Sequence, residues 1–166
     1  MTNYLYNLKE GQDIDVRGPF GKFQYLGKGE VKILIKFKPQ EYFCHKFKKI
    51  IMVAGGTGIT PMYQILQCAE KNIEKDCEFY LIYSNHTEKD ILMKKELEDI
   101  SKTINLKIAY ILTKTEGRIS LKHFENIIPQ KDKDTMVLHC GPRGFCDSVI
   151  KIMKEIDQYP INVFEF

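Results

Sequence analysis

A glycine-rich stretch follows an apolar run near residue 50, and its residue types favour phosphate binding. Residues 50–53 are Ile, Ile, Met and Val, a composition typical of a buried parallel strand. Residues 55–58 carry three glycines, and the amphipathic stretch over 59–68 predicts a helix. Glycines let the backbone approach an anion closely, and a helix N-terminus offers unpaired N–H groups. Strand, turn and helix in this order therefore predict a phosphate cradle.

This pattern departs in one place from the dinucleotide-binding fingerprint G-x-G-x-x-G/A. Gly56 and Gly58 fit its first half, but Pro61 stands where the fingerprint has Gly or Ala. Pro61 suits the first turn of a helix, where no backbone donor is required. A turn that carries glycines for purely steric reasons is the alternative, and the pattern alone leaves both interpretations open.

Polar residues also follow two other predicted strands. One set is 83–90, which ends in Asp90, and the other is 139–142, which contains Cys140. Open α/β sheets bind ligands at the carboxyl ends of their strands, so these sets are candidates for the same site. The Asp90 carboxylate could accept hydrogen bonds from ribose hydroxyls, or it could only stabilise the start of a helix. Lys89 beside it keeps a ribose phosphate conceivable.

The elements that would position these residues alternate from residue 48 onward. Strands are predicted over 49–54, 78–83, 106–112 and 135–140, helices over 60–72, 90–102, 120–127 and 143–156, and a closing strand over 162–166. This alternation predicts an α/β fold, with a parallel sheet and helices on both of its faces.

The first part of the chain has a different pattern. A short helix is predicted over 2–9, with Thr2 as its N-cap. Short strands with tight glycine turns are predicted over 14–16, 23–26 and 31–37, which is typical of the end of an antiparallel barrel or sheet. Residues 39–47 are expected to form a linker.

Composition excludes several classes of protein. The 166 residues are 43% hydrophobic, enough for a core, and a net charge of +3 gives no support to nucleic-acid binding. No apolar run approaches the ~18 residues of a membrane span, and no signal peptide is recognisable. Five cysteines without a C-x-x-C pair predict reduced thiols in an intracellular compartment. The four histidines show no ligand spacing, so we expect no metal site.

Several motifs together resemble the ferredoxin-reductase superfamily, and within it the NADH–cytochrome b5 reductases. The motifs are R-G-P-x-G at 17–21, G-G-T-G-I-T-P-M at 55–62, T-E-K-D-I-L at 87–92, C-G-P at 140–142 and F-x-F at 164–166. The resemblance implies a flavoenzyme with an antiparallel barrel for FAD and an α/β domain for NAD. Residues 1–40 would be the C-terminal remnant of the FAD-binding barrel, and 41–166 the NAD-binding domain.

The resemblance also implies roles for individual residues. Thr57 and Cys140 would be catalytic: Thr57 resembles a threonine between nicotinamide and flavin, and Cys140 a cysteine beside the reacting nicotinamide carbon. The implied cofactor contacts are Met1, Thr2, Gly55, Gly56, Thr57, Gly58, Ile59, Thr60, Pro61, Met62, Asn85, Asp90, Cys140, Gly141, Pro142 and Phe166. Without the resemblance, the threonines could be helix caps and Cys140 a buried structural thiol.

The implied activity is hydride transfer from NADH to FAD, followed by electron transfer to cytochrome b5. Lys46, Lys48 and Lys49 could face the acidic surface of that partner, or they could be solvated loop lysines. The resemblance implies that the chain lacks most of the FAD domain, because Met1-Thr2 resembles only the end of a flavin-pyrophosphate motif. A reductase module for another acceptor, of the nitrate-reductase or oxygenase type, is an alternative. A non-catalytic nucleotide-binding fragment is another.

Overall fold

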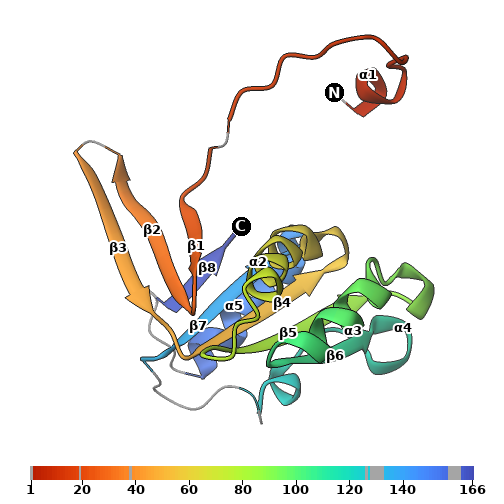
Figure 1. The fold of residues 1–166 in the computed structure, drawn as a ribbon. Helices are drawn as coiled ribbons and strands as arrows, with labels where there is room; N and C mark the ends of the chain where they lie inside the picture. Colours follow the sequence, from red (N-terminus) through yellow and green to blue (C-terminus); the bar gives the residue numbers. More distant parts are fainter. Residues whose placement is uncertain (1, 19, 38, 126, 128–132, 157–161) are drawn as a thin grey trace.

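The computed structural model of the chain describes residues 2–18, 20–37, 39–125, 127, 133–156 and 162–166. Its described part contains two sheets that follow each other along the chain, an antiparallel sheet of three strands and a parallel sheet of five (Figure 1). This arrangement confirms the predicted fold class.

The parallel sheet has the strand order β6-β5-β4-β7-β8. Its strands are β4 (Lys49–Gly55), β5 (Glu78–Asn85), β6 (Leu106–Leu112), β7 (Thr135–Cys140) and β8 (Val163–Glu165). The chain runs outward from β4 to β6 on one side and continues with β7 and β8 on the other. The topological switch point, where such sheets bind ligands, therefore lies between the carboxyl ends of β4 and β7.

Helices cover both faces of this sheet, as the alternating pattern predicts. Helices α2 (Ile59–Lys71) and α3 (Lys94–Thr103) pack with Ile50 and Met52 of β4. Helix α5 (Arg143–Glu155) packs on the opposite face with Ile51 and Val53. Successive residues of β4 thus enter two different cores, which is why its sequence is apolar throughout. None of the described helices combines the length and apolar character that a membrane crossing needs.

The antiparallel sheet packs on the α2 side. Its strands are β1 (Phe23–Gly27), β2 (Glu30–Phe37) and β3 (Gln40–Lys46), in the order β1-β2-β3. The prediction of a linker over 39–47 is wrong, because β3 pairs with β2 along its length. Phe43 and His45 are half-buried and alternate with exposed residues, so the segment is a strand covered on one side only.

The chain before β1 forms an extended arm that ends in the short helix α1 (Thr2–Tyr6) (Figure 1). The strand predicted over 14–16 is wrong: Ile14 is 45% and Val16 83% exposed, and neither belongs to a described sheet. An alternating sequence forms a strand only where a neighbouring strand accepts its backbone hydrogen bonds.

Two predicted helices also differ from the structure. The helix expected over 90–102 begins later, because a single 3-10 turn, η2 (Glu88–Asp90), precedes α3. Between 120 and 125 only the short turn η3 (Leu121–His123) forms, and residue 126 lies outside the described residues. The short helix α4 (Thr113–Glu116), which the sequence did not suggest, follows β6.

Candidate functional site: a pocket at the carboxyl edge of the parallel sheet

A pocket of about 520 Å³ opens where β4, β5 and β6 end and α5 begins. Its lining residues are Gly55, Gly56, Thr57, Ser84, Asn85, His86, Lys89, Asp90, Leu92, Thr113, Pro142 and Phe145. All three segments that the sequence placed at strand ends contribute to this lining, the third of them, 139–142, through Pro142 and not through Cys140.

The glycine turn lines this pocket with bare backbone. Gly56 has a φ of +53°, a left-handed conformation that glycine adopts without steric cost, and no atom lies within 4 Å of where its Cβ would be. Gly58 is different, because a Cβ there would lie 2.1 Å from the carbonyl oxygen of Cys140. One glycine therefore leaves room for a ligand, while the other lets the turn contact the end of β7.

Tyr83 fixes the glycine turn to the far side of the pocket. Its side chain is fully buried, and its hydroxyl donates a hydrogen bond of 3.0 Å to the carbonyl oxygen of Gly56. The same hydroxyl accepts the backbone N–H of Leu92 at 3.3 Å. Burial raises the pKa of Tyr83, so the hydroxyl stays protonated and can make both bonds. Two walls of the pocket are thus held at a fixed separation.

Two helices begin beside the pocket and make it attractive to anions. Helix α2 starts directly after Gly58 and α5 directly after Pro142, and neither has an acidic residue in its first turn. The unpaired N–H groups and the positive dipole ends of both helices therefore face no competing carboxylate of their own. A phosphate or pyrophosphate group fits such an environment.

Two residues after β5 supply groups that suit a nucleotide. Asn85 is 5% exposed and lines the pocket, and its side chain interacts with the Tyr83 hydroxyl, which opposes the effect of burial on the pKa of Tyr83. Asp90 is exposed, and its Oδ2 accepts both the N–H of Thr87 at 2.8 Å and the Thr87 hydroxyl at 2.7 Å. These bonds hold the pKa of Asp90 below its usual value, so it is a carboxylate at neutral pH.

Asp90 also closes the turn to which it belongs. The reciprocal bonds with Thr87 form a capping box around η2, and neither of them uses Oδ1 of Asp90. One carboxylate oxygen of Asp90 therefore closes the turn.

The two predicted catalytic residues, Thr57 and Cys140, lie on backbone segments that contact each other. Thr57 is exposed in the pocket, and its neighbour Gly58 abuts Cys140. Thr60 is exposed and its hydroxyl donates to the carbonyl oxygen of Thr57 at 3.2 Å. Cys140 is half-buried, and burial raises its pKa, so the group is a protonated thiol at neutral pH.

Two of the predicted cofactor contacts have side chains that point elsewhere. Ile59 and Met62 are fully buried in the core between α2 and the sheet. Only their backbone could face a ligand. Gly141 lies against Phe145, because a Cβ on Gly141 would be 2.7 Å from that ring.

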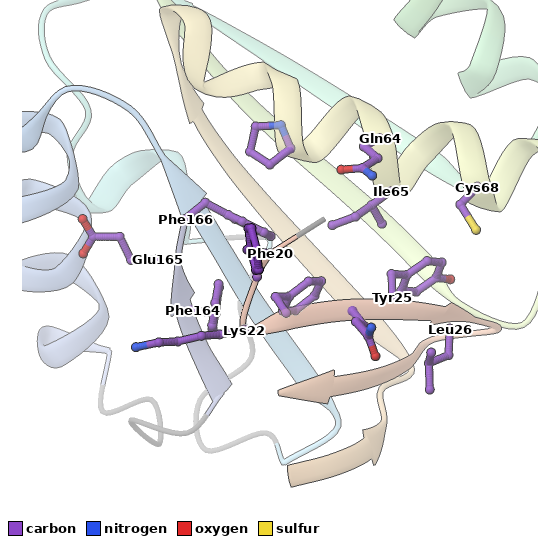
Figure 2. Close-up of a pocket in the computed structure, with 14 residues that line it drawn as sticks. Phe20, Lys22, Tyr25, Leu26, Gln64, Ile65, Cys68, Phe164, Glu165 and Phe166 are labelled. Carbon is purple, nitrogen blue, oxygen red and sulfur yellow. The ribbon is translucent and has the colours of Figure 1, made fainter. Parts of the chain in front are cut away.

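A second pocket, of about 820 Å³, lies between β1, α2 and β8 (Figure 2). It contains two predicted contacts, Pro61 and Phe166. The rings of Phe23, Phe164 and Phe166 form a cluster in which each pair of ring centroids is 5.1 Å apart. Such a surface fits a flat aromatic ring system.

The remaining predicted site residues lie away from both pockets. Thr2 begins α1 at the end of the extended arm (Figure 1), and Met1 lies outside the described residues. Lys49 begins β4, so it and its neighbours Lys46 and Lys48 lie at the amino edge of the sheet, opposite the glycine turn. Lys48 forms an ion pair of 2.6 Å with Asp134.

Six pocket residues were not among the predicted contacts: Ser84, His86, Lys89, Leu92, Thr113 and Phe145. Ser84, His86 and Lys89 belong to the set 83–90 that the sequence singled out as a whole. Thr113 directly follows the predicted strand 106–112, so the rule that singled out the other strand ends could have found it. Phe145 could not be found in this way, because its ring packs against Gly55 and Gly141, which are brought together only by the fold. In the described ranges no three His, Cys, Asp or Glu residues are placed to hold a metal ion.

The fold and this pocket define a class of protein. Residues 52–151 match the family of oxidoreductase NAD-binding domains, and the chain belongs to this family. It is an NAD-binding oxidoreductase domain of the ferredoxin-reductase superfamily.

Relatives with more specific names include two enzyme types. The chain is 38% identical over 151 residues to NADH-cytochrome b5 reductase 2 of Danio rerio, covering 86% of this chain and 48% of the relative. It is 39% identical over 153 residues to nitrate reductase [NADH] 1 of Nicotiana tabacum, covering 86% of this chain and 16% of that enzyme. The chain thus spans less than half the length of these relatives.

A solved structure agrees with both. The cytochrome b5 reductase domain of Ulva prolifera nitrate reductase superposes with a TM-score of 0.83 at 29% identity, covering 99% of this chain and 63% of that one. These similarities support an NADH-dependent electron-transfer oxidoreductase. Within the family, they support the binding of NAD and FAD.

Proposed function

We propose that this chain is the nucleotide-binding part of an NADH–cytochrome b5 reductase-type flavoenzyme. The observation that carries the proposal is the pocket at the switch point, where open glycine backbone, two helix N-termini, a buried amide and a carboxylate meet. These groups match the parts of a dinucleotide: a pyrophosphate, ribose hydroxyls and a planar base.

Each group has a distinct task in this proposal. The N–H groups around Gly56 and at the start of α2 bind the pyrophosphate. Asp90 accepts hydrogen bonds from ribose hydroxyls, and Asn85 donates one from its buried Nδ2. Bound NADH supplies the hydride and FAD the conversion to single electrons. Cys140, as a neutral thiol, and Thr57 orient the reacting ring and exclude water; neither has to act as a nucleophile or base.

The aromatic pocket of Figure 2 supports the flavin side of the proposal. Its rings, including Phe166, offer an apolar surface to a flat ring system, and Pro61 at the start of α2 belongs to this pocket. Thr2 would contact the flavin pyrophosphate only if the arm that carries it packed differently, and Met1 lies outside the described residues. We therefore propose FAD as a cofactor of the enzyme, with its main binding groups outside the described pockets.

The electron acceptor remains a proposal of the same kind. Cytochrome b5 is named by the Danio rerio relative, and an acidic haem protein would suit Lys46, Lys48 and Lys49. The similarity to nitrate reductases favours a second candidate, a reductase module that passes electrons to a haem group of nitrate-reductase type.

Acceptor assays test the proposal. In the flavoenzyme that joins this chain to a complete FAD-binding barrel, we expect NADH to reduce cytochrome b5, with ferricyanide as a control acceptor that needs no protein docking. Ferricyanide reduction without cytochrome b5 reduction would favour the second candidate. If that flavoenzyme binds NADH and FAD but reduces neither acceptor, the chain is a non-catalytic nucleotide-binding module and the enzymatic proposal is wrong.

A further inference from the structure

A buried carboxylate joins the two sheets, at the end of α2 that is remote from the nucleotide pocket. Glu74 is 4% exposed, and its Oε2 accepts hydrogen bonds from the Tyr25 hydroxyl and, at 2.8 Å, from the N–H of Lys28. The Tyr25 hydroxyl in turn accepts the N–H of Gly29 at 3.1 Å. All three donors belong to β1 or to the turn between β1 and β2, so one carboxylate holds the whole turn.

The turn is shaped to fit this carboxylate. Gly27 has a φ of +103°, and a Cβ there would lie 3.1 Å from Oε1 of Glu74. Gly29 has a φ of +78°, and a Cβ there would lie 2.1 Å from the carbonyl oxygen of Phe47. Both positions need glycine for conformation, and Gly29 needs it also for space. The turn therefore packs tightly on the α/β domain.

The end of α2 is strained in a way that directs Glu74 inward. Ile73 has a φ of +50°, which is rare for a β-branched residue, and its side chain is 64% exposed, so burial does not compensate. The N–H groups of Ile73 and Glu74 bond to the carbonyl oxygens of Glu70 and Ala69, which closes a Schellman motif. Strain of this kind persists where the surrounding structure fixes the backbone.

Stability alone does not explain a charged group at this place. Glu74 takes part in none of the described ion pairs, and its Oε1 is buried without a hydrogen-bond partner among the residues that the structure describes. Burying a carboxylate in this way is costly, and an apolar side chain would fill the space at lower cost. The nearby charge also contributes, after burial, to raising the pKa of Cys77 to about 12.

We propose that Glu74 is a positioning residue that latches the antiparallel sheet to the nucleotide-binding domain. Helix α2 starts at the nucleotide pocket and ends at this latch, ~20 Å away at ~1.5 Å per residue. The aromatic pocket lies between β1 and α2. The latch therefore keeps both pockets in one rigid unit. The need to hold the two pockets together rests on the proposed function, but the contacts of Glu74 can be tested without any cofactor.

Amide hydrogen exchange of the full chain tests the contacts. In Glu74→Ala, the amides of Lys28 and Gly29 should exchange about tenfold faster or more, while those of β4 and β5 change less than about twofold. In Tyr25→Phe, Gly29 loses its acceptor and should accelerate more than Lys28, which keeps Glu74. Matched controls are Glu96→Gln and Tyr42→Phe, which alter exposed side chains and should change neither amide.

Residual dipolar couplings test whether the sheets move together. In the wild-type chain, couplings from both sheets should fit one alignment tensor, and in Glu74→Ala they should require two. A single tensor in the variant, or equal acceleration of exchange in both sheets, would show that Glu74 only stabilises the fold. If Glu74→Ala does not fold, Tyr25→Phe decides by the same two measurements. If the wild-type chain does not bind NADH, the proposed function is wrong, but the inference about Glu74 still holds.

Discussion

Gly58 and Cys140 are in contact across the switch point of the sheet: a Cβ on Gly58 would lie 2.1 Å from the Cys140 carbonyl oxygen. Gly58 has a φ of −63°, which any residue can adopt, so glycine is needed here for space and not for conformation. The contact seats the start of α2 directly on the end of β7. The glycine turn at 55–58 and the C-G-P motif at 140–142, which carry the proposed chemistry, therefore fix each other's position.

Gly58→Ala should separate the start of α2 from the end of β7. The added methyl group meets backbone, which cannot rotate away, and overpacking of this kind costs typically ~1–3 kcal/mol. We expect a lower free energy of unfolding in urea and weaker NADH binding by calorimetry. Gly144→Ala is the matched control, because nothing lies within 4 Å of its Cβ position in α5 and alanine favours a helix. Equal behaviour of the two variants would contradict the contact.

Asp90→Ser should change the choice of nucleotide. The carboxylate favours ribose hydroxyls and repels a 2′-phosphate, and hydrogen bonds to charged groups contribute ~1.5–3 kcal/mol, or about ten- to a hundredfold in affinity. The variant should bind NADH more weakly and NADPH more tightly, because Lys89 remains in the pocket. The ratio of the two dissociation constants measures this. A change of less than about threefold would leave Asp90 with only its role in the capping box with Thr87.

Cys140→Ser should affect the chemical step more than binding. The thiol would lie beside the reacting carbon and not beside the adenosine, so the limiting rate of flavin reduction should fall while the dissociation constant for NADH changes little. Stopped-flow measurements on the FAD-containing enzyme separate these quantities. An unchanged limiting rate with a raised dissociation constant would place Cys140 outside the reaction centre.

Stability should decrease on acidification because of His139. This residue is 1% exposed, and burial lowers its pKa below the ordinary value of 6.5, against a smaller opposing effect of Glu165. Below pH 6.5 the unfolded chain binds a proton that the folded chain does not. The free energy of unfolding therefore decreases as the pH is lowered. One group limits this slope to about 1.4 kcal/mol per pH unit. Urea unfolding between pH 7.5 and 5 should show a flatter profile for His139→Leu, and identical slopes would exclude this cause.

The site was predictable where its signals are local in sequence. The apolar run before Gly55 predicted β4. Polar residues at strand ends predicted the pocket, because the carboxyl ends of parallel strands meet at one edge of the sheet. The strand β3 was not predictable in this way, since its residues are exposed on one side and its partner β2 determines its conformation. Conversely, Ile14 and Val16 alternate like a strand but have no described partner.

Relations between distant residues could not be predicted from composition or spacing. The ring of Phe145 packs against Gly55 and Gly141, and the Tyr83 hydroxyl bonds to Gly56. The start of α3 was predicted too early, because the Thr87–Asp90 capping box closes a separate turn that a periodic pattern does not distinguish from a helix.

Titration of the isotope-labelled chain with NADH, followed by NMR, tests the central claim most directly. If the pocket at the carboxyl edge binds the nucleotide, the amide resonances of Gly56, Thr57, Asn85 and Asp90 shift together along one saturable curve, while those of β2 and β3 do not. Shifts that do not saturate, or that map to the antiparallel sheet and not to the carboxyl edge of the parallel sheet, would contradict this claim.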